Sequence, residues 1–167
     1  MTGVMTTPDR QPIACEIRLI DAASTGALRQ AVLRPHQTLA ECVYPGDNDE
    51  TSFHYGAFHD DQLVTIASLN VERETRFAQF PQTRQLRLRG MATDPSYRGH
   101  GFGKAVLQRC LAHAWSTGAE LLWCNARTTA AGYYERMGFL VIPDTFELPA
   151  IGPHRVMYIT PDVDTFS

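Results

Sequence analysis

A glycine-rich loop beside an arginine is the clearest chemical feature of this sequence. Residues 98–103 read Arg-Gly-His-Gly-Phe-Gly, and an apolar helical pattern follows directly. Glycines let a ligand approach the backbone, and the first N–H groups of a helix lack intrahelical acceptors. The helix dipole also favours negative charge there. The loop therefore predicts a phosphate-binding cradle; a glycine-rich turn that only joins a strand to a helix is the alternative.

Two common phosphate motifs do not fit this loop. The dinucleotide fingerprint GxGxxG fails in both registers, because Lys104 and Val106 occupy the place of the third glycine. The nucleotide motif GxxxxGK[ST] fails because its first glycine would fall on Arg98 and its hydroxyl residue on Ala105. The sequence therefore argues against both of these nucleotide sites.

A third pattern does fit. Residues 98–103 match [QR]xxGx[GA], and residues 125–139 contain an asparagine, an alanine-rich turn, a tyrosine, a glutamate and Gly-Phe in order. Together with the lead-in at residues 93–99, these segments resemble the GNAT superfamily of N-acetyltransferases. The resemblance extends over about residues 16–160. Residues 28–49 and 147–159 are also similar to the ElaA-like branch, although the Gly-Ile-Pro-His of that branch is Ile-Gly-Pro-His here.

The resemblance implies acetyl-coenzyme A as co-substrate and transfer of its acetyl group to a primary amine of a small molecule or peptide. Two alternatives are a coenzyme A-binding sensor domain without turnover and a partner-binding protein, and another acyl chain such as succinyl is open. The implied coenzyme A contacts are Met91, Thr93, Arg98, Gly99, His100, Gly101, Phe102, Gly103, Lys104 and Asn125. Met91 and Thr93 would act through their main chain. Asn125 would touch the pantetheine or position the next helix, unless it only caps a turn.

Two residues are candidates for proton transfer. Tyr134 lies where many family members carry a tyrosine that protonates the coenzyme A thiolate. A phenol with a pKa near 10 can donate a proton to the thiolate of a thiol with a pKa near 8.5. A core aromatic is the alternative for Tyr134, and we assign Tyr133 to the core. His154 is the best candidate base, because an imidazole pKa near 6.5 suits neutral pH. A solvent-facing turn histidine is equally consistent with the sequence, and Glu41 or a water chain could act instead.

Two arginines occupy the strand where some family members place a glutamate base. Arg87 and Arg89 share one face of this strand, and simple alternation continues that face to Met91. If the face lines the acceptor site, it favours an acceptor with a carboxylate, which arginine grips bidentately. Ion pairs with Glu72 or Glu74 on a neighbouring strand are the alternative.

The elements that must position these residues form a mixed pattern. Strands are predicted at residues 16–20, 85–93, 120–126, 139–143 and 155–160, and a hairpin at 52–72 turns at Asp60 and Asp61. A helix is predicted at 21–34, with Asp21 or Ser24 as N-cap and Leu28, Val32 and Leu33 on one face. Two further helices are predicted at 102–118 and at 128–137. This order predicts an α+β fold of the GNAT type, with a mixed, mostly antiparallel central sheet flanked by helices.

Composition bounds the remaining possibilities. The 167 residues fit a single domain at 14–167, and residues 1–13 read as a disordered tail without the apolar segment of a secretory signal. A net charge of -3 gives no reason to expect a nucleic acid or membrane partner. The four cysteines and six histidines are scattered, so we expect no metal site and a reduced, cytoplasmic location. A homodimer is compatible with the resemblance.

Overall fold

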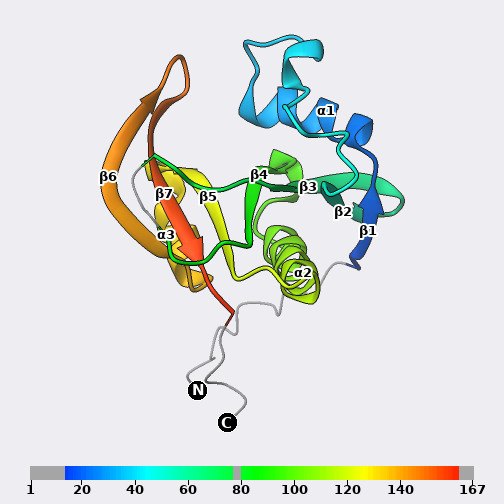
Figure 1. Ribbon diagram of the computed structural model, residues 1–167. Coiled ribbons are helices and arrows are strands. Elements are labelled where there is room, and N and C mark those ends of the chain that lie inside the picture. The colour runs from blue at the N-terminus through cyan, green and yellow to red at the C-terminus, as the bar shows by residue number, and fades with distance from the viewer. Residues whose placement is uncertain (1–13, 77–79, 162–167) are drawn as a thin grey trace, which may run out of the picture.

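Seven strands form one sheet in the order β1-β2-β3-β4-β5-β7-β6 (Figure 1). The computed structural model describes residues 14–76 and 80–161, so the predicted tail at residues 1–13 lies outside the described residues. The strands are β1 (Glu16–Ile20), β2 (Phe53–His59), β3 (Gln62–Val71), β4 (Gln85–Thr93), β5 (Leu121–Arg127), β6 (Leu140–Leu148) and β7 (Gly152–Ile159). Only β4 and β5 are parallel neighbours; the other five pairs are antiparallel. This arrangement confirms the predicted α+β fold.

The helices lie on both faces of the sheet. They are α1 (Gly26–Leu28), α2 (Phe102–Ser116) and α3 (Ala131–Arg136), and a π-helical turn at Arg29–Leu33 follows α1. Single 3-10 turns occupy Ala22–Thr25, Ala40–Cys42, Pro95–Tyr97 and Thr128–Ala130. Figure 1 shows α1 and α2 on opposite sides of the sheet, and the tip of the β6–β7 hairpin on the side that carries α1. Within the described residues, no helix has the length and apolar character needed to cross a bilayer.

The main core fixes the position of α2. Phe102, Val106, Leu107, Cys110 and Ala114 are all buried, and their helical spacing makes one stripe that packs against the sheet. Because this stripe begins at the first residue of α2, it also anchors the N-terminal end of the helix beside the end of β4. The predicted helix at 102–118 is therefore confirmed in place and in orientation.

Two predicted turns are confirmed by their backbone angles. Asp60 and Asp61 join β2 to β3 with φ values of 48° and 61°, and His59 pairs with Gln62 across them. Two central residues with positive φ match the twist of a two-residue hairpin. Gly118 ends α2 with φ +85°, which glycine adopts without steric cost.

The predicted helix at 21–34 is wrong in its buried face. Asp21 does cap the segment by accepting a hydrogen bond from the Ser24 N–H, but the segment is a chain of short, irregular helical turns. Its largest buried side chain is Arg29, not the apolar stripe expected from Leu28, Val32 and Leu33. The buried charge is stabilised by Asp47, whose carboxylate lies 2.6 Å from the guanidinium. A partner 18 residues away cannot be read from helical periodicity.

The parallel strands β4 and β5 separate after a short contact. They pair only from Gln85 with Leu121 to Arg87 with Trp123. Beyond that point none of the described strands pairs with the β5-facing edge of β4, so its backbone donors and acceptors are available to other partners. The gap opens at the end of β4 that leads into the glycine loop.

A bulge in β4 lies at this opening. Ala92 pairs with Ile66 and Arg89 pairs with Ser68, so Gly90 and Met91 together oppose one residue of β3. Gly90 has φ +64°, and a Cβ there would lie 3.1 Å from the Arg29 Nε atom. The bulge breaks the alternation that placed Met91 on the face of Arg87 and Arg89. That prediction is wrong for Met91, whose sulfur lies beside Tyr134 instead.

Candidate active site

One cleft is lined by the glycine loop and the end of β4. We call it the loop cleft; it holds about 550 Å³ of space accessible to water, which is in the range of small-molecule sites. Its lining residues are Val32, Leu33, Met91, Ala92, Thr93, Tyr97, Arg98, Gly99, Gly101, Phe102, Gly103, Lys104, Arg127, Ala130, Tyr133 and Tyr134. The loop, the end of β4 and α3 therefore enclose one space.

The N-terminal end of α2 faces this cleft with features suited to an anion. Gly101 is the N-cap with φ +81°, and the first intrahelical bond runs from the Ala105 N–H to the Gly101 oxygen. The N–H groups of Gly103 and Lys104 thus have no acceptor within the helix. No acidic residue lies in the first turn, and the Lys104 side chain is exposed. Backbone donors, the helix dipole and a lysine all favour negative charge here.

The absence of a side chain at Gly101 and Gly103 leaves space beside the N-terminal end of α2. A Cβ on Gly101 would meet no atom within 4 Å, so that space is empty rather than filled by the protein. A Cβ on Gly103 would lie 3.2 Å from the Tyr133 hydroxyl and 3.5 Å from the Met91 methyl carbon. A side chain at either position would therefore intrude on the cleft.

The structure brings together eight of the ten residues implied to contact coenzyme A. These are Met91, Thr93, Arg98, Gly99, Gly101, Phe102, Gly103 and Lys104. Phe102 is buried in the core, so only its main chain can face a ligand. His100 lies outside the loop cleft, and Asn125 lies on the wall of a second cavity.

The second cavity lies on the α1 side of the gap between β4 and β5. We call it the arginine cavity; it is bounded by Leu33, Arg34, Tyr44, Arg87, Leu88, Arg89, Gly90, Met91, Cys124, Asn125, Ala126, Arg127, Ala130, Tyr134, Leu148 and His154. Five residues line both cavities: Leu33, Met91, Arg127, Ala130 and Tyr134. The two spaces therefore meet between β4 and α3, around Met91 and Tyr134.

Tyr134 places a hydroxyl group at this junction. Its hydroxyl lies 3.8 Å from the Met91 sulfur, and its ring packs edge-on to Phe139 at 5.3 Å between centroids. Burial raises the pKa of Tyr134 well above its usual value, and the neighbouring Cys124 adds to the rise. The phenol is therefore protonated at neutral pH and can donate a proton.

Tyr133 also faces the loop cleft, which the sequence did not indicate. Its ring packs against the core as predicted, but its hydroxyl is buried without a hydrogen-bond partner. Burial raises its pKa as well. A buried hydroxyl without a partner is costly, and a ligand in the loop cleft could supply one. Consecutive helical positions point in different directions, but α3 lies along the cleft, so both tyrosines reach it.

His154 lies in strand β7 and is 4% exposed. The interpretation as a solvent-facing turn histidine is therefore wrong. Its Nδ1 atom lies 2.8 Å from the Gly152 carbonyl oxygen, which can only accept, so Nδ1 carries the hydrogen and Nε2 the lone pair in the neutral ring. Burial lowers the pKa of His154, the nearby Arg127 and Arg34 lower it further, and the bond to Gly152 opposes the change. The side chain lines the arginine cavity as a neutral base.

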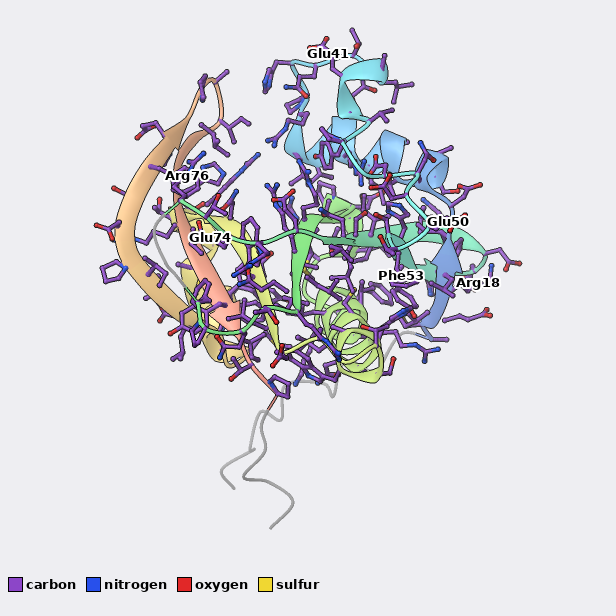
Figure 2. All side chains as sticks on the ribbon, in the orientation of Figure 1. Arg18, Glu41, Glu50, Phe53, Glu74 and Arg76 are labelled. Carbon is purple, nitrogen blue, oxygen red and sulfur yellow. The ribbon has the colours of Figure 1, made fainter. Side chains whose placement is uncertain are left out.

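Glu41 lies far from both cavities. Figure 2 shows it at the outer end of the segment between α1 and β2, where it is exposed. Its carboxylate accepts hydrogen bonds from the Thr38 N–H and hydroxyl, at 3.2 Å and 3.0 Å. Glu41 therefore acts as a local cap and is not placed to take a proton from a bound amine. Among the described residues, no three His, Cys, Asp or Glu side chains gather in a way that could hold a metal ion.

The two arginines of β4 have different surroundings. Arg87 forms an ion pair with Glu72 at 2.9 Å, as the alternative interpretation predicted, and its guanidinium lies over Trp123. Arg89 has no ion pair within the described residues, and its guanidinium lies 4.2 Å from the centre of the Tyr44 ring. The two positions therefore cannot be treated as equivalent.

Comparison with known proteins agrees with this geometry. The sequence profile of the acetyltransferase (GNAT) family matches residues 21–139. The chain is 36% identical over 145 residues to the uncharacterized N-acetyltransferase YitI of Bacillus subtilis (strain 168). The aligned region covers 87% of this chain and 95% of YitI. The family profile includes both the glycine loop and the Tyr134 segment.

Solved structures share the fold. ElaA of Escherichia coli superposes with a TM-score of 0.68 at 15% identity, over 87% of this chain and 99% of ElaA. An aminoglycoside 6′-N-acetyltransferase complexed with coenzyme A superposes with a TM-score of 0.67 at 14% identity, over 87% and 96% of the two chains. At these identities the likeness concerns the fold alone, so membership of the ElaA-like branch stays a prediction. The family match and the close relative together show that this chain is an acyltransferase and belongs to the acetyltransferase (GNAT) family.

Proposed function

We propose that the protein transfers an acetyl group from acetyl-coenzyme A to a primary amine of a small molecule or peptide. The observation that carries the proposal is the meeting of two cavities at Met91 and Tyr134, in the gap between β4 and β5. One cavity ends at an anion cradle, and the other contains a neutral histidine. A donor and an acceptor could thus approach the same point from opposite sides of the sheet.

Coenzyme A fits the residues of the loop cleft. The backbone N–H groups of Gly103 and Lys104 would bind its pyrophosphate, and the unpaired edge of β4 would hold the pantetheine arm through main-chain groups near Met91 and Thr93. The empty space at Gly101 supports this placement. The aminoglycoside acetyltransferase complexed with coenzyme A, which shares this fold, supports the choice of co-substrate.

The bound co-substrate supplies a thioester that is open to attack by an amine. His154 Nε2 would accept a proton from the amine, directly or through water, as the nitrogen–carbon bond forms. The carbon–sulfur bond then breaks, and Tyr134 donates its phenolic proton to the departing sulfur. A phenol is protonated at neutral pH, so Tyr134 has a proton to donate, although its raised pKa makes it a weaker acid. The lowered pKa of His154 keeps its nitrogen free.

A two-stage assay tests this proposal. Acetyl-coenzyme A, free coenzyme A, NAD and ATP are first compared by thermal shift, where a ligand at 100 times its dissociation constant should stabilise by roughly 2.7 kcal/mol. Release of free thiol is then followed over a panel of amines. We expect stabilisation by the two coenzyme A compounds alone, and thiol release with at least one amine. Binding without turnover of any amine would favour a sensor domain, and no binding would refute the proposal.

We further propose that the protein works in the cytoplasm. All four cysteines are free thiols, and Cys42, Cys110 and Cys124 are buried. Burial raises the pKa of both Cys110 and Cys124 to about 12, so neither is a reactive thiolate. Free, unreactive thiols suit a reducing compartment. The partners that we propose are the co-substrate and an amine acceptor, with neither nucleic acid nor a membrane.

A further inference from the structure

Four arginines and no acidic residue line the arginine cavity. The arginines are Arg34, Arg87, Arg89 and Arg127. Arg87 is neutralised by Glu72 at 2.9 Å. Arg127 donates to the Leu33 carbonyl oxygen at 2.9 Å, and Arg34 lies 3.5 Å from the same atom. Each of these three arginines therefore already makes an ion pair or a hydrogen bond within the protein.

Arg89 is the exception. Within the described part of the chain it makes no ion pair and no hydrogen bond, and its Nε atom is buried without a partner. Burial, together with the positive charge of Arg87, lowers the pKa of Arg89 to about 10. Buried polar groups normally have partners, so an unpaired guanidinium in a cavity indicates a ligand that provides them.

Tyr44 holds the Arg89 guanidinium in a defined orientation. Arg89 lies over the Tyr44 ring at 4.2 Å, and Arg29 lies over the same ring at 3.9 Å. The Tyr44 N–H donates to the Asp47 carboxylate at 2.8 Å, and Asp47 also neutralises Arg29. A guanidinium that packs over an aromatic ring can still direct its planar N–H groups toward a planar anion. The Arg29 charge on the same ring is thus balanced by Asp47, whereas the Arg89 charge has no counter-ion among the described residues.

The position along β4 brings this charge close to the reacting centre. Arg89 precedes Met91 by two residues, a span of roughly 6 Å along a strand. Met91 and Tyr134 mark the junction of the two cavities. A group bound at Arg89 therefore lies within a few bonds of an amine that reacts at the junction.

We propose, on the basis of the acyl-transfer function above, that Arg89 binds a carboxylate of the acceptor, so that the acceptor is a small amine carrying a nearby carboxylate, as in an amino acid or a short peptide. A guanidinium and a carboxylate match in geometry and charge and form two parallel hydrogen bonds. A polyamine would bring further positive charge into a cavity that contains arginines and no acid. The proposal thus favours amines that carry a carboxylate and excludes polyamines.

The first arm of the test uses the wild-type protein. Thiol release from acetyl-coenzyme A is measured with L-amino acids and dipeptides, with their carboxamides, and with spermidine. We expect turnover of at least one carboxylated amine and a KM at least tenfold higher for its carboxamide, a difference of about 1.4 kcal/mol. Equal KM values for the pair, or spermidine as the best substrate, would overturn the proposal.

The second arm changes the side chain. Arg89→Gln should raise the KM for the carboxylated amine at least tenfold, change kcat little, and leave the KM of its carboxamide unchanged. Arg89→Lys keeps the charge but loses the bidentate geometry, so its KM for the carboxylated amine should lie between those of wild type and Arg89→Gln. Arg109→Gln is the matched control, because Arg109 is an exposed arginine on α2 and lies outside the arginine cavity. Equal effects of Arg89→Gln on both amines would contradict carboxylate binding.

Coenzyme A binding separates the two possible failures. If acetyl-coenzyme A does not stabilise the wild-type protein, the proposed function itself fails. If it does, and an amine without a carboxylate is turned over while no carboxylated amine is, the carboxylate proposal alone is wrong. Thermal stabilisation by coenzyme A should be the same in Arg89→Gln and wild type, which also shows that the variant is folded.

Discussion

The Tyr134 hydroxyl and the Met91 sulfur lie 3.8 Å apart, at the place where the two cavities meet. One residue comes from α3 and the other from the bulge of β4, so the contact spans the gap left by the separation of β4 and β5. A proton donor is thereby held at the β5-facing edge of β4, beyond the point where the two strands pair.

Tyr134→Phe should lower kcat and leave the KM for acetyl-coenzyme A nearly unchanged. The substitution removes only the donor hydroxyl and keeps the ring that packs against Phe139. Loss of an acid–base group lowers rates by about 10²–10⁴-fold. Steady-state kinetics with a fixed amine measures the effect. Tyr158→Phe is the control, because Tyr158 packs against Phe80 and lines neither cavity, so its hydroxyl should not affect kcat. Unchanged turnover in a folded Tyr134→Phe variant would make Tyr134 a packing residue.

Gly101→Ala should weaken coenzyme A binding at least tenfold. A methyl group there would enter the open cradle, and φ +81° is unfavourable for any residue with a Cβ. Gly118→Ala separates strain from binding, because Gly118 has φ +85° at the other end of the same helix. Both variants should lose stability in chemical denaturation. Only the first should lose affinity in calorimetric titration, and equal affinities would argue against the cradle.

The pH dependence should follow His154. Because burial lowers the pKa of this imidazole below 6.5, Nε2 stays free at neutral pH and is protonated only under more acidic conditions. We expect kcat/KM to fall as pH drops through an apparent pKa below 6.5, and His154→Gln to lower the plateau and remove that limb. The pKa of His113 is also lowered, but its ring contacts Phe53 and Tyr55 away from both cavities. His113→Gln should therefore keep the wild-type profile, and loss of the limb in that variant would point to a different base.

The buried Arg29–Asp47 pair should be important for stability. Asp47→Asn would leave the Arg29 charge, whose side chain is 1% exposed, without its counter-ion. Removing one partner of a buried pair costs about 3–5 kcal/mol, which equilibrium unfolding in urea can measure. Glu16→Gln, which breaks an exposed pair with Arg18, should change little by comparison. Similar losses in the two variants would mean that the buried network contributes no more than a surface contact.

The sequence predicted the features that depend on local patterns. Periodicity placed α2, Asp60 and Asp61 marked the β2–β3 turn, and Gly118 marked the end of α2. The motif placed Tyr134, which lines the loop cleft. It did not reveal what depends on distant partners. The burial of Arg29 requires Asp47, and the close approach of Arg29 and Tyr44 explains why glycine occupies the bulge at position 90. His154 illustrates the same limit, since its burial comes from pairing with β5 and β6 and not from its own turn.

The proposed function is best tested by a crystal structure with acetyl-coenzyme A bound. We expect the pyrophosphate at the backbone N–H groups of Gly103 and Lys104, and the pantetheine arm between β4 and β5. We also expect the thioester sulfur within direct or single-water hydrogen-bond reach of the Tyr134 hydroxyl. Density for the co-substrate at another surface, or a sulfur on the far side of β4 from Tyr134, would contradict the proposed function.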